Sequence, residues 1–166
     1  MQTPQQVEAV GIGKQFGAFR ALDDASLIVP SGTFHALVGE NGAGKSTLMG
    51  ILAGFVVPDT GACLLGEKAL PAGKPFECKR LGIGMIHQHF TLVPEFTVAE
   101  NLALASLESL YRTVKPNRDA AKALDLASEL GWKVEPNAKI RDLAVGAQQR
   151  IEILKALAGD ARVVIL

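Results

Sequence analysis

The sequence predicts an α/β fold whose core is a mainly parallel sheet. Strand-like apolar segments alternate with helical ones along the chain. Two of the strand-like segments are apolar along their length, as is typical of strands that helices cover on both faces. A glycine-rich loop also joins one strand to a helix, an order that recurs in α/β domains.

Apolar patterns predict strands from one end of the chain to the other. These lie at residues 7–12, 25–29, 34–38, 62–65, 83–88 and 161–166. The sequence Pro58-Asp59-Thr60-Gly61 is a favourable turn before the fourth of them. The first thirty residues are therefore expected to form short strands joined by turns.

Helices are predicted between and after these strands, at residues 47–53, 97–110, 118–130 and 148–158. Thr97 and Glu100 form a capping box at the start of the second helix. Apolar residues recur at helical spacing in the third, which stops at Gly131. The polar, proline-containing stretch at 114–117 is a candidate boundary between a helical lobe and the rest.

Composition narrows the class of protein. The chain has 166 residues, the size of one domain, and its 17 basic and 17 acidic residues balance, so no excess of positive charge points to nucleic acid. Cys63 and Cys78 lack metal-ligand spacing and are expected to be reduced thiols of a cytosolic protein. No apolar run approaches the ~20 residues that span a bilayer, so membrane attachment would need another polypeptide.

A complete phosphate-binding loop follows the strand at 34–38. Its residues are Gly39, Glu40, Asn41, Gly42, Ala43, Gly44, Lys45 and Ser46, and Thr47 begins the next helix. Glycines let the backbone point several N–H groups at one phosphate, and the helix N-terminus adds partial positive charge. Lys45 supplies a charge to the outer phosphates, and the Ser46 hydroxyl is placed to bind Mg²⁺. The alternative is a glycine-rich turn without a ligand.

Gln88 ends the predicted strand at 83–88 and precedes an apolar, turn-breaking segment at 89–96. Its amide could face a metal-bound water and sense phosphate occupancy, although a glutamine at the end of a strand is more often simply solvated. His87 and His89 flank it. Side chains two residues apart in a strand share one face, and no third ligand is nearby, so we do not expect the two imidazoles to form a metal site.

A second loop of small residues enters a helix near residue 145. It consists of Leu143, Ala144, Val145, Gly146, Ala147 and Gln148. The helix N-terminus makes this loop a potential anion site by the same physics as the first. An ordinary helix start explains it equally well.

Together the three motifs resemble the nucleotide-binding domain of ABC transporters. The phosphate loop, the Gln88 segment that runs into residues 97–102 and the Gln-Gln-Arg helix match that family in order and spacing, from about Val7 to the last residue. Residues 145–157 are similar to the importers of simple sugars and nucleosides. The resemblance implies a P-loop NTPase fold with an N-terminal antiparallel part. It also implies a nucleotide-binding core at 1–96, an inserted helical lobe at 97–145, and the signature helix with a further strand at 146–166.

The resemblance also assigns roles to single residues. Phe16 matches the aromatic residue that stacks on adenine, and Gln88 matches the Q-loop glutamine that contacts Mg²⁺ or its water. Residues 143–148 match the signature loop, which contacts ATP held by the opposite domain. Expected partners are ATP, Mg²⁺, a second ATP-binding domain in a head-to-tail dimer, and integral-membrane permease subunits that contact the region after Gln88. Nucleic acid is not expected.

Two departures from the family pattern matter. Ala144 stands where the signature usually has a serine, so a donor to the γ-phosphate is missing. Residues 162–166 resemble the strand that leads, in the family, to an aspartate for Mg²⁺ and a glutamate for the attacking water. Both would lie beyond Leu166. The chain is therefore expected to be C-terminally incomplete, a fragment that binds ATP without hydrolysing it alone.

The leading hypothesis is an ATPase subunit that couples ATP binding and hydrolysis to the import of a sugar- or nucleoside-type solute. It would be peripheral, at the cytoplasmic face of the cell membrane, and Lys45 and Gln88 would act in catalysis by the intact protein. Two alternatives stay open: a soluble ABC-type ATPase that is not tied to a transporter, and a non-catalytic nucleotide-binding fragment.

Overall fold

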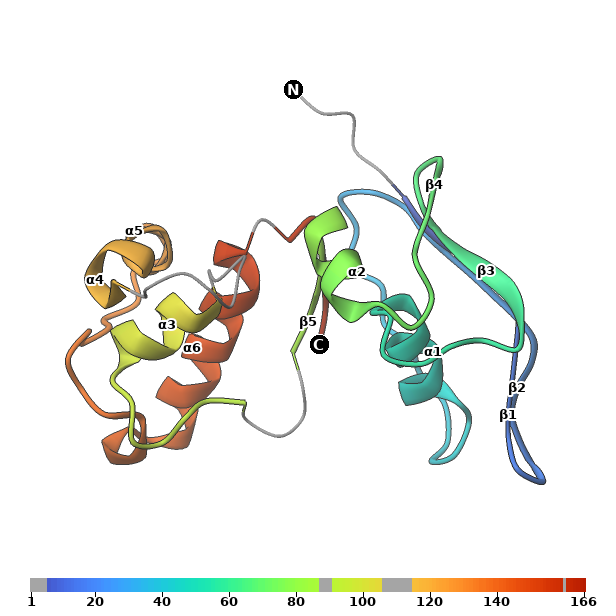
Figure 1. Cartoon of the computed structure of the whole chain (residues 1–166), viewed down its shortest axis with the longest axis horizontal. Coiled ribbons are helices and arrows are strands. Elements are labelled where there is room, and N and C mark those ends of the chain that lie inside the picture. Colours follow the sequence, from blue (N-terminus) through green and yellow to red (C-terminus); the bar gives the residue numbers. More distant parts are fainter. Residues whose placement is uncertain (1–5, 87–90, 106–114, 160) are drawn as a thin grey trace. The chain divides into compact units, whose positions relative to one another are not determined.

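The computed structural model describes residues 6–86, 91–105, 115–159 and 161–166 (Figure 1). The chain divides into two compact units, residues 1–83 and 84–166. The first unit carries an antiparallel sheet with two helices. The second carries a helical cluster and a two-stranded parallel sheet. The phosphate loop lies in the first unit and residues 143–148 lie in the second.

The sheet of the first unit has the strand order β2-β1-β3-β4. Its strands are β1 (Val7–Phe16), β2 (Phe19–Val29), β3 (Thr60–Leu65) and β4 (Lys68–Ala69), and every neighbouring pair is antiparallel. The predicted strands at 7–12, 25–29 and 62–65 are confirmed, and each is longer than predicted. The short β4 was missed because two residues carry no periodic pattern.

Two helices belong to this unit, α1 (Lys45–Leu52) and α2 (Pro75–Leu81). Helix α1 buries Leu48, Ile51 and Leu52, and the predicted helix at 47–53 is thus confirmed. Helix α2 was not predicted. The sequence does contain residues that favour the start and the end of a helix here. Pro75 occupies the first turn, and Gly82 ends the helix with a φ of 105°.

The segment at 34–38 has no regular secondary structure, so the strand predicted there is wrong for this structure. Phe34 and Val38 are almost fully exposed. An apolar run becomes a strand only where neighbouring strands complete its backbone hydrogen bonds, and none of the described residues pairs with this segment. The apolar pattern did not predict this outcome, because strand pairing depends on partners that are distant in the sequence.

In the second unit, strands β5 (Ile83–Met85) and β6 (Val163–Ile165) form the parallel sheet, and the Ile86 amide donates to the Ile165 carbonyl at 2.8 Å. These two short strands are the whole of the parallel sheet within the described residues. They confirm the predicted strand at 161–166 and the first half of that at 83–88. Residues 87–90 lie outside the described part of the chain.

Helices α3 (Val98–Ala105), α4 (Pro116–Asp119), α5 (Ala121–Glu129) and α6 (Val145–Ala158) and the 3₁₀ turn η1 (Ile140–Asp142) complete this unit. The largest fully buried apolar side chains of their shared core come from α3, η1 and α6: Val98, Leu102, Ile140, Ile151 and Leu154. The capping box is confirmed, because the Thr97 amide donates to Glu100 at 2.7 Å and the Glu100 amide donates to the Thr97 hydroxyl at 3.2 Å.

Two helix boundaries differ from the prediction. The helix expected at 118–130 is divided into α4 and α5 at Ala120, a fully buried residue. Helix α6 begins at Val145 rather than at residue 148. Residues 106–114, at the end of the predicted helix at 97–110, lie outside the described residues.

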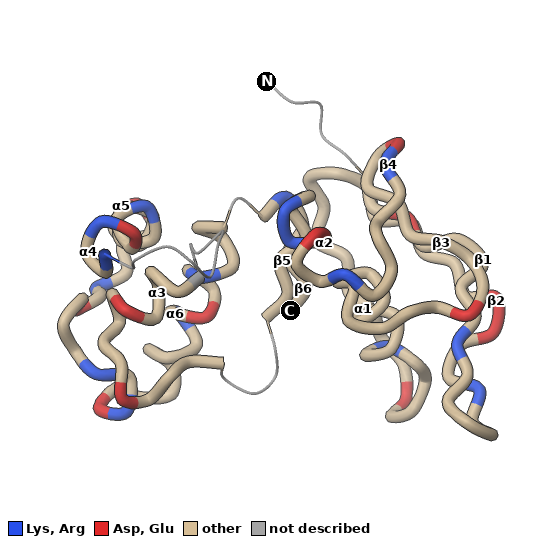
Figure 2. The backbone as a smooth tube through the Cα atoms, viewed as in Figure 1, with Lys and Arg blue, Asp and Glu red and all other residues tan. Residues whose placement is uncertain are grey.

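The charged residues of the described part of the chain are distributed as the balanced numbers of basic and acidic residues lead one to expect. Figure 2 shows basic and acidic residues interspersed along both units, with no block of one sign. Among the described residues, no helix combines the length and the apolar character needed to cross a membrane.

Candidate nucleotide-binding site

The glycine-rich loop enters helix α1 through Gly44, whose φ is 81°. A Cβ atom on Gly44 would lie 2.5 Å from the carbonyl oxygen of Ala21 and 2.6 Å from a methyl group of Leu22. Both the left-handed backbone and the close approach to β2 therefore require glycine at this position. As a result, the loop is seated directly against the sheet.

Lys45 folds back over the loop. Its ammonium group donates to the carbonyl oxygens of Gly39, at 2.8 Å, and Glu40, at 2.7 Å. The amides of Lys45, Ser46 and Thr47, in the first turn of α1, find no acceptor among the residues that the structure describes. An ammonium group above a loop with free N–H donors is the arrangement that binds a phosphate group.

The residues present fit a magnesium ion that arrives with a nucleotide. No cluster of three or more His, Cys, Asp and Glu side chains in the described part of the chain could hold a metal by itself. The Ser46 hydroxyl is exposed in the first turn of α1, beside the free amides. Mg²⁺ commonly binds through one or two protein oxygens plus phosphates and water. The second predicted ligand, Gln88, lies outside the described residues, as do His87 and His89.

Phe16 lies at the end of β1, and its ring is 48% exposed. The Lys14 ammonium lies 5.3 Å from the ring centroid, close enough for a cation–π contact. Lys14 pairs with Leu22 of β2, the residue against which Gly44 packs. The Phe16 end of the β1–β2 hairpin and the phosphate loop are thus connected through strand β2. The exposed ring of Phe16 is free to stack on a planar base.

Asp59 ties the end of β1 to β3, a role that sequence reasoning missed. Its carboxylate accepts hydrogen bonds from the Lys14 ammonium, at 2.9 Å, and the Gln15 amide, at 2.7 Å. Its own amide donates to the Gly13 carbonyl at 2.8 Å. The hydrogen bond from Lys14, and then that from Gln15, lower the pKa of Asp59. The sequence marked Asp59 only as a turn residue, since partners in other strands leave no local signal.

We expect this attachment to depend on pH. Because the pKa of Asp59 is lowered in the folded chain, the stability that its carboxylate contributes is present above its ordinary value of 3.8 and is lost as the pH falls through the lower folded value. The unfolding free energy of the parent should therefore exceed that of Asp59→Asn at pH 7, and the difference should shrink below pH 3.8. Denaturant titrations at both pH values measure this. Asp125→Asn, at an exposed position on α5, is the control, and a difference independent of pH would contradict the assignment.

Residues 143–148 form the corner between η1 and α6. Ala144 is the N-cap of α6, with φ −60° and ψ 149°, and no side chain caps this end. The Gln148 amide group donates to the carbonyls of Ile140, at 3.2 Å, and Leu143, at 3.0 Å, and so holds the corner in place. Val145 and Gly146 are exposed. The first turn of a long helix is therefore open, as an anion site requires.

Comparison with known proteins identifies the family. Residues 22–166 match the family model described as ABC transporter. The chain belongs to the ABC transporter family. It is 43% identical over 159 residues to the nucleoside import ATP-binding protein NupA of Lactococcus lactis and, equally, to the ribose import ATP-binding protein RbsA of a Chelativorans species. Each match covers 96% of this chain, which spans 31% of the relative's length.

Solved structures of ABC cassettes share the fold. A cassette in its ADP conformation superposes with a TM-score of 0.82 at 27% identity, over 98% of this chain and 68% of that one. A dimeric cassette in a post-hydrolysis state, bound to ADP and Pi, has a TM-score of 0.75 at 25% identity, over 95% of this chain and 72% of that one. The expected P-loop NTPase fold of an ABC cassette is thus confirmed.

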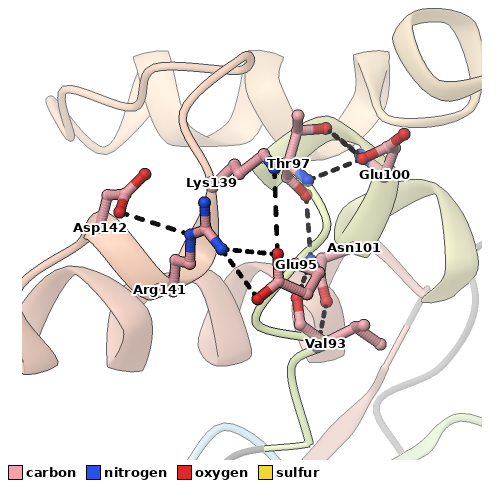
Figure 3. A network of polar contacts seen from close by, with 8 residues as sticks. All are labelled: Val93, Glu95, Thr97, Glu100, Asn101, Lys139, Arg141 and Asp142. Carbon is pink, nitrogen blue, oxygen red and sulfur yellow. Dashed lines mark hydrogen bonds and ion pairs between the residues drawn. The ribbon is translucent and has the colours of Figure 1, made fainter.

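The segment that follows the predicted Q-loop glutamine of this ABC chain is held by polar contacts, partly buried around Asn101 and exposed at Glu95 (Figure 3). The side chain of Asn101, 2% exposed, accepts from the Val93 amide at 2.7 Å and donates to the carbonyls of Val93 and Thr97 at 3.1 and 3.0 Å. Glu95 pairs with Arg141 at 2.8 Å. The sequence did not mark these residues, because their partners are distant or belong to the main chain.

Proposed function

We propose that this chain binds ATP with Mg²⁺ through residues 39–46, as part of an ATP-hydrolysing subunit of a solute importer. The observation that carries the proposal is the Lys45 ammonium held over the loop at 2.8 and 2.7 Å from two carbonyls, next to the free amides of α1. Ser46 would contribute the protein oxygen to the metal. The names of the relatives, which specify nucleoside and ribose import, support a sugar- or nucleoside-type solute.

The same family membership supports the proposed partners. A second ATP-binding domain would contact ATP through its signature corner, residues 143–148. That a related cassette bound to ADP and Pi is dimeric supports the pairing of two such domains. Permease subunits would contact the region after Gln88, and the complex would lie at the cytoplasmic face of the membrane. Gln88 would meet the metal or its water and, with Lys45, would serve hydrolysis in the intact protein.

Calorimetric titration of the chain with Mg-ATP tests the proposal. We expect a saturable heat with one site per chain, and a weaker one when EDTA removes the metal, because Mg²⁺ neutralises phosphate charge and bridges the phosphate oxygens. A folded chain that gives no saturable heat with Mg-ATP would overturn the proposal.

Phe16→Ala is expected to weaken Mg-ATP binding by about tenfold, since stacking of a base on an aromatic ring is worth roughly 1–3 kcal/mol. Phe16→Tyr keeps the ring and should bind within about twofold of the parent. Competition titrations with a fluorescent ATP analogue measure both variants. If the alanine variant binds as tightly as the tyrosine variant, Phe16 does not stack on the base.

A further inference from the structure

Lys14, near the end of β1, has a charged side chain to which the proposed phosphate chemistry gives no role. This side chain is only 15% exposed, although the charged end of a lysine is usually solvated. Its ammonium lies over the Phe16 ring, 5.3 Å from the ring centroid, and donates to the Asp59 carboxylate at 2.9 Å. One ammonium group therefore contacts both a carboxylate and one face of an exposed aromatic ring.

Asp59 holds the main chain on both sides of Lys14. Its amide donates to the Gly13 carbonyl at 2.8 Å, and its carboxylate accepts from the Gln15 amide at 2.7 Å. Asp59 thus contacts three successive residues of β1. Because the main chain around Lys14 and its ammonium are both held, the side chain is already ordered before a ligand binds, and little further conformational entropy is lost on binding.

The strand that pairs with Lys14 also contacts the phosphate loop. The pairing of β1 with β2 shifts by one residue beside Lys14, so that Ala21 is an extra residue of β2, as in a β-bulge. Lys14 itself pairs with Leu22. Ala21 and Leu22 are the residues against which Gly44 of the phosphate loop packs. The Phe16 ring and the phosphate loop are therefore attached to the same strand pair, as suits one ligand with a base at one end and phosphates at the other.

We propose that Lys14 is a positioning residue, which holds the Phe16 ring so that the face opposite its ammonium stacks on the base of the nucleotide. This inference rests on the proposed function, in which Phe16 is the residue that stacks on the base. The ammonium is attracted to the negative face of the ring and restricts the rotation of the ring. A ring that is held in one orientation loses less freedom on stacking than a mobile one does. Lys14 touches neither base nor phosphate in this scheme and acts through Phe16.

A double-mutant cycle on the affinity for Mg-ATP, measured by calorimetry on the full chain, tests the inference. Lys14→Met keeps an unbranched apolar stem but loses the ammonium. It should weaken Mg-ATP binding by about two- to fivefold, the contribution of a cation–π contact at an exposed site. In a Phe16→Ala background the same substitution should have no further effect, because the ring that Lys14 holds is already absent. Lys68→Met, at an exposed position on β4, changes the net charge equally and should leave the affinity unchanged in both backgrounds.

Two further variants cover the case in which Lys14→Met folds poorly. Lys14→Arg keeps a cation that can pair with Asp59 and lie over the ring, so it should bind Mg-ATP within about twofold of the parent. Asp59→Asn keeps an acceptor for the Gln15 amide but loses the charge that holds the ammonium, and it should weaken binding only where Phe16 is present. Losses that are equal in the two backgrounds, or absent from both, would overturn the inference alone. Absence of Mg-ATP binding by the folded parent would overturn the proposed function, and this inference with it.

Discussion

Replacing Lys45 by alanine is expected to weaken Mg-ATP binding by about ten- to a hundredfold. The ammonium is the charged donor of the loop, and losing a hydrogen bond to a charged group costs roughly 1.5–3 kcal/mol. In the structure this ammonium already lies over the loop, on the carbonyls of Gly39 and Glu40, so little reorganisation precedes its contact with a phosphate. Calorimetry of parent and variant under identical Mg-ATP conditions measures the loss.

The control for this experiment is Lys68→Ala, at an exposed position on β4 in the same unit. It changes the net charge of the chain by the same amount as Lys45→Ala does. It should bind like the parent. Thermal unfolding of Lys45→Ala should show that its fold persists, because the two hydrogen bonds lost lie on the exposed loop. Equal affinity of the two alanine variants would show that the loop is not the nucleotide site.

Ala144→Ser is expected to have two separate effects, one on stability and one on association. Ala144 has N-cap geometry but no capping side chain, so serine should raise the unfolding free energy by about 1 kcal/mol. If the corner contacts ATP held by a second domain, the new hydroxyl also supplies the missing donor. Dimerisation in the presence of Mg-ATP should then tighten by about tenfold or more, since hydrogen bonds to charged groups contribute roughly 1.5–3 kcal/mol.

Ala144→Asp separates the two effects. Aspartate caps the helix as well as serine does and gains from the helix dipole, but its charge repels a phosphate. Both variants should therefore be more stable than the parent in denaturant titrations. Only the serine variant should show stronger Mg-ATP-dependent dimerisation by sedimentation. Stronger dimerisation in both, or in neither, would show that the corner does not contact the phosphate.

The sequence predicted a local feature well where the residues that produce that feature all lie within one short segment. The capping box of Thr97 and Glu100 and the glycine that ends α5 behave as expected, because each depends on neighbours within a few residues. The division of the predicted helix at Ala120 could not be predicted in the same way. It coincides with a small side chain that is buried in the core of the second unit, and burial of this kind depends on residues distant in the sequence.

In the candidate site, too, the features that depend on neighbouring residues were predictable and those that depend on distant residues were not. The order of Gly39 to Ser46 was enough to predict the loop, its helix and its lysine, and the structure adds the reason for Gly44, which is its contact with Ala21 and Leu22. Two sets of contacts gave no sequence signal. The Asp59 carboxylate accepts from the Gln15 amide, 44 positions away, and the Glu152 carboxylate accepts from the Thr91 amide, 61 positions away.

By itself, the sequence determined the family and predicted the phosphate loop and the signature loop, because these motifs are contiguous and their chemistry depends on residue type and local backbone. Tertiary structure alone decided which apolar segments pair as strands and which polar side chains are buried together. Residues 34–38 carry a strand pattern yet form no strand, whereas Glu152 carries no pattern yet is paired and buried. Strand pairing and the burial of charge both depend on partners that are brought close only when the chain folds.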